Sequence, residues 1–276
     1  MKAPNSIHIP ESITSTANAE VKFLRALHER KYRRQSGWFL AEGTRICSEA
    51  VSLGWEMHRL AFLAGRENEP HVRMLLDALD NSDGRVLPMS EKLLQRISRK
   101  DNPQMLLGAF RQKWADLDTI FPDQARPWIA LDRVRDPGNL GTIMRSADAV
   151  GAKGIILIDD CTDPYSVEAV RASMGAIFNV EIVQCNHVDF LDFTQGWISN
   201  QGQIIGTALP ASVDYRDADY SGALMILMGN EQAGLPPALT QACTQLIRLP
   251  MLGRSDSLNL AVATGVTLYE ALRNRR

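Results

Sequence analysis

The stretch Leu224-Met-Ile-Leu-Met-Gly-Asn-Glu-Gln-Ala-Gly-Leu-Pro-Pro237 decides the fold of this chain. Its apolar run ends abruptly at Gly229, Asn230 and Glu231, which predicts a buried strand that delivers a tight turn and one carboxylate at its carboxyl end. Ligands bind at that end of the strands in open α/β sheets. The stretch therefore predicts an α/β protein with a ligand site directly after this strand.

Outward along the chain, a second short apolar run, Leu246-Ile-Arg-Leu249, breaks at Pro250 and passes Gly253 into a segment of helical period. Two broken loops followed by a helix can together form a pocket for a flat, mostly neutral ligand. The alternative interpretation is the ordinary strand, loop and closing helix of any α/β domain. Neither loop alone decides between the two.

Composition indicates a globular protein of one large or two modest domains, with 276 residues and a formal net charge of -2. No apolar run reaches the roughly 18 residues of a membrane span, so we expect no transmembrane helix. Residues 1–8 lack the apolar core of a signal peptide, so we expect a cytoplasmic protein. The slightly negative net charge argues against a protein that binds nucleic acid over its whole surface, as histones do. Any nucleic-acid site must therefore be a local basic patch.

Cysteine usage points to reduced thiols and no structural metal site, because the spacing includes no Cys-x-x-Cys and no histidine at ligand distance. The four residues are Cys47, Cys161, Cys185 and Cys243.

A local basic patch occurs near the start of the chain, where we expect a basic helical arm over residues 1–36. Val21, Leu24, Leu27 and Tyr32 lie near helical spacing, and Asn18 is a candidate cap. The basic residues around them, which we predict to contact RNA phosphates, are Lys22, Arg25, Arg30, Lys31, Arg33 and Arg34. The alternative is a solvated amphipathic helix without a ligand.

Residues 37–112 alternate between helical and strand patterns, with helices expected over 44–53, 72–79 and after Ser90. This predicts a small layered α/β domain with no catalytic constellation, and therefore a binding role. Residues 113–126 carry charges and a proline without an apolar period, which is typical of a linker.

Residues 127–276 open with a buried strand, Trp128-Ile-Ala-Leu131, and then Pro137-Gly138 makes a turn. We expect Asn139 to cap the next helix and Arg145, in its second turn, to reach the pocket mouth. The alternation that follows predicts a mostly parallel sheet of five or six strands with helices on both faces. The closing helix carries one apolar stripe, formed by Leu258, Val262, Val266, Tyr269 and Leu272.

A dinucleotide site is the rival interpretation of this turn, because Asp159 and Asp160 end the next strand about 20 residues after Gly138, as a ribose-binding acid does. However, Gly138-Asn-Leu-Gly141 lacks the Gly-x-Gly-x-x-Gly pattern, which weakens this reading.

Three separated blocks resemble motifs one, two and three of the SpoU (TrmH) branch of the SPOUT RNA methyltransferases, in matching order and spacing. They are Asp136-Pro-Gly-Asn-Leu-Gly-Thr-Ile-Met-Arg145, Met228-Gly-Asn-Glu-Gln-Ala-Gly-Leu235, and Ile247-Arg-Leu-Pro-Met251 followed by Ser257-Leu-Asn-Leu-Ala-Val-Ala263. The front module, with Phe39-Leu-Ala-Glu-Gly43 and Asn102-Pro-Gln104, is similar to the ribosomal-protein-like substrate-binding domain often fused to that core.

The resemblance implies an α/β SPOUT domain with a deep trefoil knot and S-adenosylmethionine as cofactor. Gly229, Leu249 and Leu258 would line the cofactor site, and Asn230 and Pro250 would shape it. It also implies a homodimer in which Arg145 of one subunit meets the cofactor of the other, and an RNA substrate, rRNA rather than tRNA.

The chemistry that the resemblance implies is methyl transfer to a ribose 2′-hydroxyl, which requires the oxygen to be positioned and its proton managed. Family proposals make Arg145 the base; a guanidinium ordinarily stays protonated, so we expect a phosphate clamp that stabilises the developing alkoxide. Glu231 and Asn259 would orient Arg145 or the ribose, and Asn139 would hold the motif-one turn. As alternatives, Glu231 caps its loop and Asn259 is a plain helix cap.

Motif three departs from the family pattern in one position, because Ala261 stands where a serine is usual. The cofactor pocket does not depend on that hydroxyl, but substrate contacts do. Three hypotheses follow: an rRNA or tRNA ribose 2′-O-methyltransferase, a non-catalytic RNA-binding protein that kept the fold, and the dinucleotide enzyme.

Overall fold

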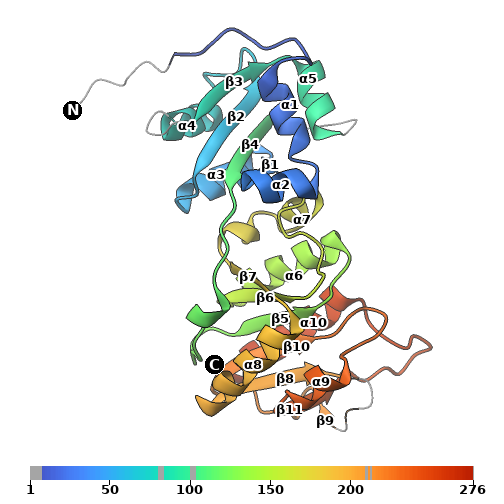
Figure 1. Cartoon of the computed structure of the whole chain (residues 1–276). Helices are drawn as coiled ribbons and strands as arrows, with labels where there is room; N and C mark the ends of the chain where they lie inside the picture. Colours follow the sequence, from blue (N-terminus) through green and yellow to red (C-terminus); the bar gives the residue numbers. More distant parts are fainter. Residues whose placement is uncertain (1–7, 80–83, 100–103, 209–210, 212, 276) are drawn as a thin grey trace. The chain divides into compact units, whose positions relative to one another are not determined.

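The computed structural model describes residues 8–79, 84–99, 104–208, 211 and 213–275. The chain forms two compact units, residues 1–112 with 165–178 (unit 1) and residues 113–164 with 179–276 (unit 2). Each unit has its own sheet (Figure 1). The predicted division was contiguous, so the placement of residues 165–178 in unit 1 corrects it.

Unit 1 is built on a four-stranded sheet in the order β1-β4-β2-β3, in which β4 runs antiparallel to β1 and β2, and β3 runs parallel to β2. Helices α1, α2 and α5 cover one face, and α3 and α4 cover the other (Figure 1). The strands are β1 (Trp38–Glu42), β2 (Met57–Leu63), β3 (Arg85–Met89) and β4 (Leu106–Arg111). The helices are α1 (Ala19–Ala26), α2 (Arg30–Ser36), α3 (Thr44–Ser52), α4 (Pro70–Leu79), α5 (Glu91–Ser98), α7 (Val167–Ala172) and the 3₁₀ turn η2 (Ala176–Phe178).

The predicted basic arm is part of unit 1, because Val21, Leu24 and Leu27 are fully buried in its core. Asn18 caps α1 as expected, accepting a hydrogen bond from the Glu20 backbone N–H at 2.8 Å. The helical pattern corresponds to two helices. It breaks into α1 and α2 around Leu27, where the Arg33 guanidinium donates to the carbonyls of Leu27 and His28, both at 2.8 Å.

Residues 165–178 belong to unit 1 through buried contacts with β1 and α3. Tyr165 is fully buried with its ring centroid 4.7 Å from that of Phe39. The Trp55 indole donates to the Phe178 carbonyl at 2.9 Å, and Arg171 forms an ion pair with Glu42 at 2.6 Å. Nothing in the local pattern of this segment distinguishes packing against one unit from packing against the other. The Asn102 and Pro103 part of the front motif lies outside the described residues.

Unit 2 is built on a seven-stranded sheet in the order β7-β6-β5-β10-β8-β11-β9, and every described strand pair in it is parallel. The strands are β5 (Trp128–Asp132), β6 (Gly154–Ile158), β7 (Glu181–Cys185), β8 (Gly202–Thr207), β9 (Val213–Asp214), β10 (Ala223–Met228) and β11 (Gln245–Arg248). The helices are η1 (Leu117–Thr119), α6 (Pro137–Ala149), α8 (His187–Ser199), α9 (Pro237–Gln241) and α10 (Leu260–Asn274).

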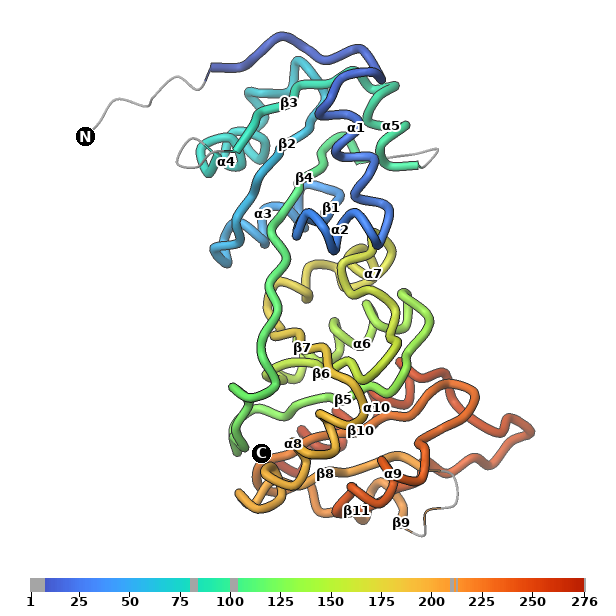
Figure 2. Tube along the Cα trace, viewed as in Figure 1, coloured from blue at the N-terminus to red at the C-terminus, as the bar shows by residue number. Residues whose placement is uncertain are grey.

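The α/β class and the mostly parallel sheet are confirmed, and the two-residue strand β9 takes the sheet beyond the expected five or six strands. Strand β10 lies between β5 and β8, in the middle of the sheet, and all six of its residues are buried. The loop that follows it therefore starts at the middle of the edge formed by the carboxyl ends of the strands. Figure 2 traces the chain from β8 through β10 to β11. The trefoil knot stays a prediction, because strand order alone does not establish threading.

Helix α10 corrects the predicted apolar stripe. Val262 and Tyr269 are 52% and 56% exposed, and the buried face consists of Ala261, Thr264 and Leu268 with their neighbours. This face packs on α6 and β10. Small side chains allow the close approach to α6, so the more strongly apolar stripe is left on the outside. Among the described helices none is both long and apolar enough to cross a membrane.

Candidate functional site

The loop that follows β10, residues 229–235 (the cofactor loop), is held by Asn230. Its backbone N–H and carbonyl pair with Gly234 at 3.2 and 2.9 Å, and its side-chain oxygen accepts from the backbone N–H groups of Gln232 and Ala233. At Gly229 a Cβ would lie 2.3 Å from the Gly234 carbonyl carbon, so no larger residue fits. The sharp end of the apolar run thus reflects a loop folded tightly on itself.

A buried charge network anchors this loop to the end of β5. The Asn230 amide donates to the Arg133 carbonyl at 2.9 Å, and Arg133 has a left-handed backbone with φ of 49°. Its guanidinium pairs with Asp132 at 2.9 Å, and Asp132, only 1% exposed, also meets the His187 ring at 2.6 Å. Sequence reasoning missed Asp132, Arg133 and His187, although an acid that ends a buried strand was the available signal.

The cofactor loop, the loop after β11 and the start of α10 surround a cavity of about 530 Å³. Gly229, Asn230, Glu231, Leu249 and Leu258 line it. Their predicted roles toward a cofactor and a ribose stay predictions. Pro250 does not line it, although its neighbours Leu249 and Met251 do. The remaining lining residues include Thr207, Leu235, Ile247, Arg248, Asp256, Ser257 and Leu260.

The cavity fits a nucleoside-bearing cofactor in size and in chemistry. Its volume lies in the range of about 300–1,000 Å³ that small-ligand pockets occupy. Leu249 and Leu258 offer aliphatic walls for a flat ring, while Ser257 offers a hydroxyl group. The charged side chains in the lining are Glu231, Arg248 and Asp256, so no strong excess of either sign excludes a zwitterionic ligand.

Three polar residues from separate segments meet beside the cavity. Asn259 donates to the Asn139 side-chain oxygen at 2.9 Å, and Asn139 donates to Glu231 at 3.4 Å. Asn259 also caps α10, accepting from the backbone N–H groups of Ala261 and Val262, so it serves as both bridge and cap. Glu231 and Asn259 are exposed, and Asn139 is half-buried.

Asn139 is not the cap of α6, which corrects the expectation. Asp136 caps this helix by accepting from the Asn139 backbone N–H at 2.7 Å, and Pro137 occupies the first turn. The Asn139 side chain is therefore available to the Glu231 and Asn259 side chains, which a capping role would have prevented.

Arg145 lies on α6 with an exposed side chain and does not line the cavity. Within the described part of the chain it makes no hydrogen bond or ion pair. The structure therefore brings Asn139, Glu231 and Asn259 together but does not join Arg145 to them.

The predicted basic RNA contacts are not all accessible. Arg33 is 3% exposed and its guanidinium binds backbone carbonyls, so it cannot contact RNA, which corrects its assignment. The exposed members of the set are Lys22, Arg25, Lys31 and Arg34, and Arg30 is half-buried.

The geometry supports neither a reactive thiol nor a dinucleotide-binding site. Burial raises the pKa of Cys161 to about 12, which keeps that thiol protonated. Asp159 contacts the His187 backbone and ring, and Asp160 pairs with Arg135 at 2.6 Å, so both candidate ribose-binding acids already have protein partners. No group of three or more His, Cys, Asp or Glu residues in the described ranges is arranged to hold a metal ion.

The parallel sheet and the cavity at its carboxyl edge define an α/β protein with a small-ligand pocket at that edge. Comparison with known proteins assigns it further. Residues 127–269 match the SpoU rRNA Methylase family, and residues 18–108 match the MRM3-like substrate binding domain. The chain belongs to the SpoU rRNA methylase family, and it is an RNA ribose 2′-O-methyltransferase that uses S-adenosylmethionine.

Relatives match over nearly the whole chain. An rRNA methyltransferase from Sinorhizobium meliloti, solved with the cofactor bound, is 45% identical with a TM-score of 0.89, covering 95% of this chain and 97% of that one. The 23S rRNA (uridine(2479)-2′-O)-methyltransferase of Streptomyces viridochromogenes is 32% identical over 90% of this chain and 87% of its own. An uncharacterized tRNA/rRNA methyltransferase of Synechocystis is 34% identical over 96% and 94%.

Proposed function

We propose that the protein methylates a ribose 2′-hydroxyl of ribosomal RNA, with Asn139, Glu231 and Asn259 positioning the sugar beside the cavity. The observation that carries this proposal is their convergence, through two side-chain hydrogen bonds, at the rim of a cavity of cofactor size. Relatives that are named for 23S rRNA support rRNA rather than tRNA as the substrate.

When bound, S-adenosylmethionine supplies a methyl group on a sulfonium, a strong electrophile that needs no further activation. The residues of this chain then have to place the ribose oxygen in line and exclude water. Leu249 and Leu258 hold the cofactor on its apolar side, and Asn230 and Pro250 keep the two loops in shape. Asn139 and Asn259 offer donors and acceptors to the sugar, and Glu231 keeps Asn139 oriented.

Arg145 is assigned as a clamp on the RNA phosphate that also stabilises the developing alkoxide. Its exposure and its absence from the cavity of its own chain favour a role at the cavity of a partner subunit. We therefore include a homodimer in the proposal. The exposed apolar residues Val262 and Tyr269 of α10 offer a contact surface for it.

The direct test is transfer of labelled methyl from S-adenosylmethionine to rRNA. We expect Arg145→Ala to lower the rate by about a hundredfold or more, because a charge stabiliser of the reacting oxygen is lost. Arg73→Ala is the control, since Arg73 is a half-buried arginine of α4 whose guanidinium pairs with Asp77. Equal rates for the two variants would contradict the assignment.

Mixing two inactive variants tests the role in trans. Leu258→Glu obstructs the cavity while leaving Arg145 intact, and Arg145→Ala leaves the cavity intact. If sites are shared between subunits, mixed dimers restore roughly a quarter of the wild-type rate, since half of the dimers are mixed and each has one complete site. If each chain completes its own site, mixing restores nothing.

A further inference from the structure

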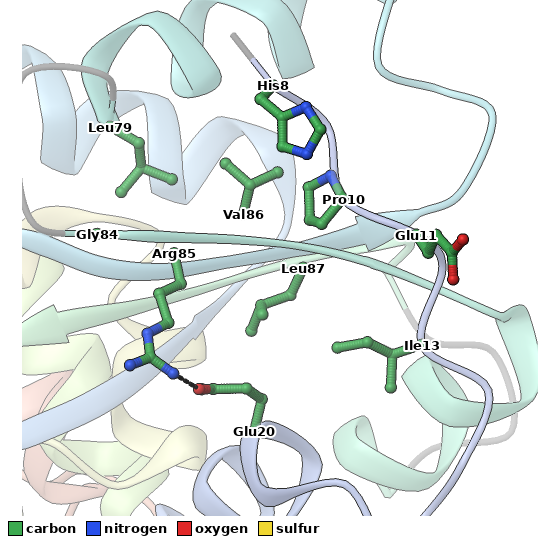
Figure 3. A pocket seen from close by; sticks show the side chains of 10 residues that line it. All are labelled: His8, Pro10, Glu11, Ile13, Glu20, Leu79, Gly84, Arg85, Val86 and Leu87. Carbon is green, nitrogen blue, oxygen red and sulfur yellow. Dashed lines mark hydrogen bonds and ion pairs between the residues drawn. The ribbon is translucent and has the colours of Figure 1, made fainter.

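A second cavity lies in unit 1, remote in sequence from the cofactor motifs. Its volume is about 520 Å³, and it lies between the segment of residues 8–13 and the edge strand β3. Figure 3 shows His8, Val86, Leu87 and Ile13 around the opening, with Arg85 and Glu20 joined at one end. Residues 8–13 precede the part of the chain that matches the substrate-binding domain, so this cavity depends on chain that the family match does not include.

The edge of β3 presents backbone groups to this cavity. The Ile13 N–H donates to the Pro88 carbonyl at 2.8 Å and the Ser90 N–H donates to the Ile13 carbonyl at 3.2 Å, so Pro88 and Ser90 face outward. Because backbone groups alternate along a strand, the N–H and carbonyl of Val86 face the same way. Among the described residues they have no backbone partner on that side. Val86 therefore offers one donor and one acceptor.

At the charged end of the cavity, two arginines surround one carboxylate, so positive charge is in excess. The Glu20 carboxylate binds Arg59 and Arg85, each at 2.5 Å. Although burial raises the pKa of Glu20, the hydrogen bonds and charges of Arg59 and Arg85 lower it overall, so this carboxylate is ionised. Arg59 is buried, whereas the Arg85 side chain is 65% exposed and uses one nitrogen on Glu20. Arg85 thus has further donors that point to solvent.

Building on the proposed function, we propose that this cavity binds one unpaired nucleotide of the RNA substrate. The base lies along the edge of β3, with Val86 and the His8 ring on one side of it and Ile13 and Leu87 on the other (Figure 3). Its polar edge pairs with the Val86 backbone. Its phosphate binds Arg85. Unpaired bases are bound by such stacking on a ring or an apolar surface, together with a cation for the backbone.

An added peptide strand fits this edge less well than a base. Pro88 has no N–H, and Ile13 already occupies the edge beyond it, so the open edge amounts to the groups of Val86. One donor and one acceptor match the edge of a base, while strand addition requires a longer row. Glu11 is the one other acid in the lining, and its carboxylate points away from the opening in Figure 3.

The test uses the full chain and a fluorescein-labelled 12-nucleotide single-stranded RNA of mixed sequence, with a duplex of the same length as second probe. Anisotropy titrations at fixed salt give the Kd of each. We expect His8→Ala to weaken single-strand binding about tenfold, the size of one lost base contact. Arg85→Gln should weaken it to a similar extent, because it removes the cation that binds the phosphate. His8→Ala should leave duplex binding unchanged, because a paired base cannot enter the cavity.

Arg73→Gln is the control for loss of one positive charge elsewhere in unit 1 and should change neither Kd. The proposal is overturned if His8→Ala and Arg85→Gln bind the single strand like wild type, or if Arg73→Gln weakens it equally. The proposed function is judged separately, by methyl transfer to rRNA by the wild-type protein. Normal transfer with unaffected variants refutes only the cavity, whereas a wild type without transfer refutes the methyltransferase assignment.

Discussion

At the scale of single residues, Asn230 holds the cofactor loop with all of its polar groups. Its backbone pairs with Gly234, its side-chain oxygen accepts two backbone N–H groups, and its amide reaches the Arg133 carbonyl. Alanine would remove the three side-chain bonds and free the loop from the end of β5. Because these bonds shape a wall of the cavity, their loss should act on ligand binding.

We therefore expect Asn230→Ala to weaken S-adenosylmethionine binding by about tenfold or more, since each lost hydrogen bond contributes on the order of 1 kcal/mol. Isothermal calorimetry measures the affinity. Gln241→Ala is the control, because Gln241 is exposed and does not line the cavity. Wild-type affinity in Asn230→Ala would show that the loop keeps its shape without the anchor.

Asn259 combines two roles that the sequence analysis treated as alternatives. Asn259 caps α10 and also bridges to Asn139, so the plain cap and the site residue are one side chain. Arg33, by contrast, does not have the role that its sequence context predicted. It lies in a basic stretch, but its guanidinium binds backbone carbonyls and the residue is buried. The charge pattern could not separate Arg33 from its exposed neighbours, since all occupy the same helical stretch.

At the scale of elements, α10 has two apolar faces that pack differently. The small residues lie against α6, and Val262 and Tyr269 face outward. We expect Val262→Asp to shift the proposed dimer toward monomer, because it places a charge in an apolar contact. The helix itself should tolerate the change, since an acid in the first turn interacts favourably with the helix dipole.

Sedimentation velocity across a concentration series measures this shift. The matched control is Val188→Asp on α8, which is 66% exposed and also lies near the start of its helix. A dimer that survives Val262→Asp, or that dissociates equally in Val188→Asp, would mean that the outer face of α10 is not the contact.

At the scale of the whole molecule, residues 165–178 pack in a different unit from the residues on either side of them in the sequence. They lie inside the stretch that matches the methylase family, but they pack in unit 1. Arg171 pairs with Glu42, which is 6% exposed, across 129 residues of sequence. Stability of unit 1 therefore depends on a segment between β6 and β7 of the other sheet.

We expect Arg171→Ala to destabilise unit 1 by about 2 kcal/mol, because the buried Glu42 carboxylate loses a charged hydrogen bond of 2.6 Å. Hydrogen exchange should show faster opening of β1 and β4, with β5 and β10 unchanged. Exchange that accelerates equally in both sheets would indicate that the two units unfold together. Arg135→Ala, which breaks the exposed pair with Asp160, is the control.

The sequence by itself determined the α/β class, the strand that ends at Gly229 and the tight loop that follows it. Each of these depends on the backbone geometry of its own segment: apolar period, glycine at a crowded position, a cap before a helix. Only the tertiary structure decided that residues 165–178 join unit 1, that Arg33 is buried and that Asp132, Arg133 and His187 anchor the cofactor loop. These contacts join residues far apart in the chain, and they depend on packing geometry that no local pattern specifies.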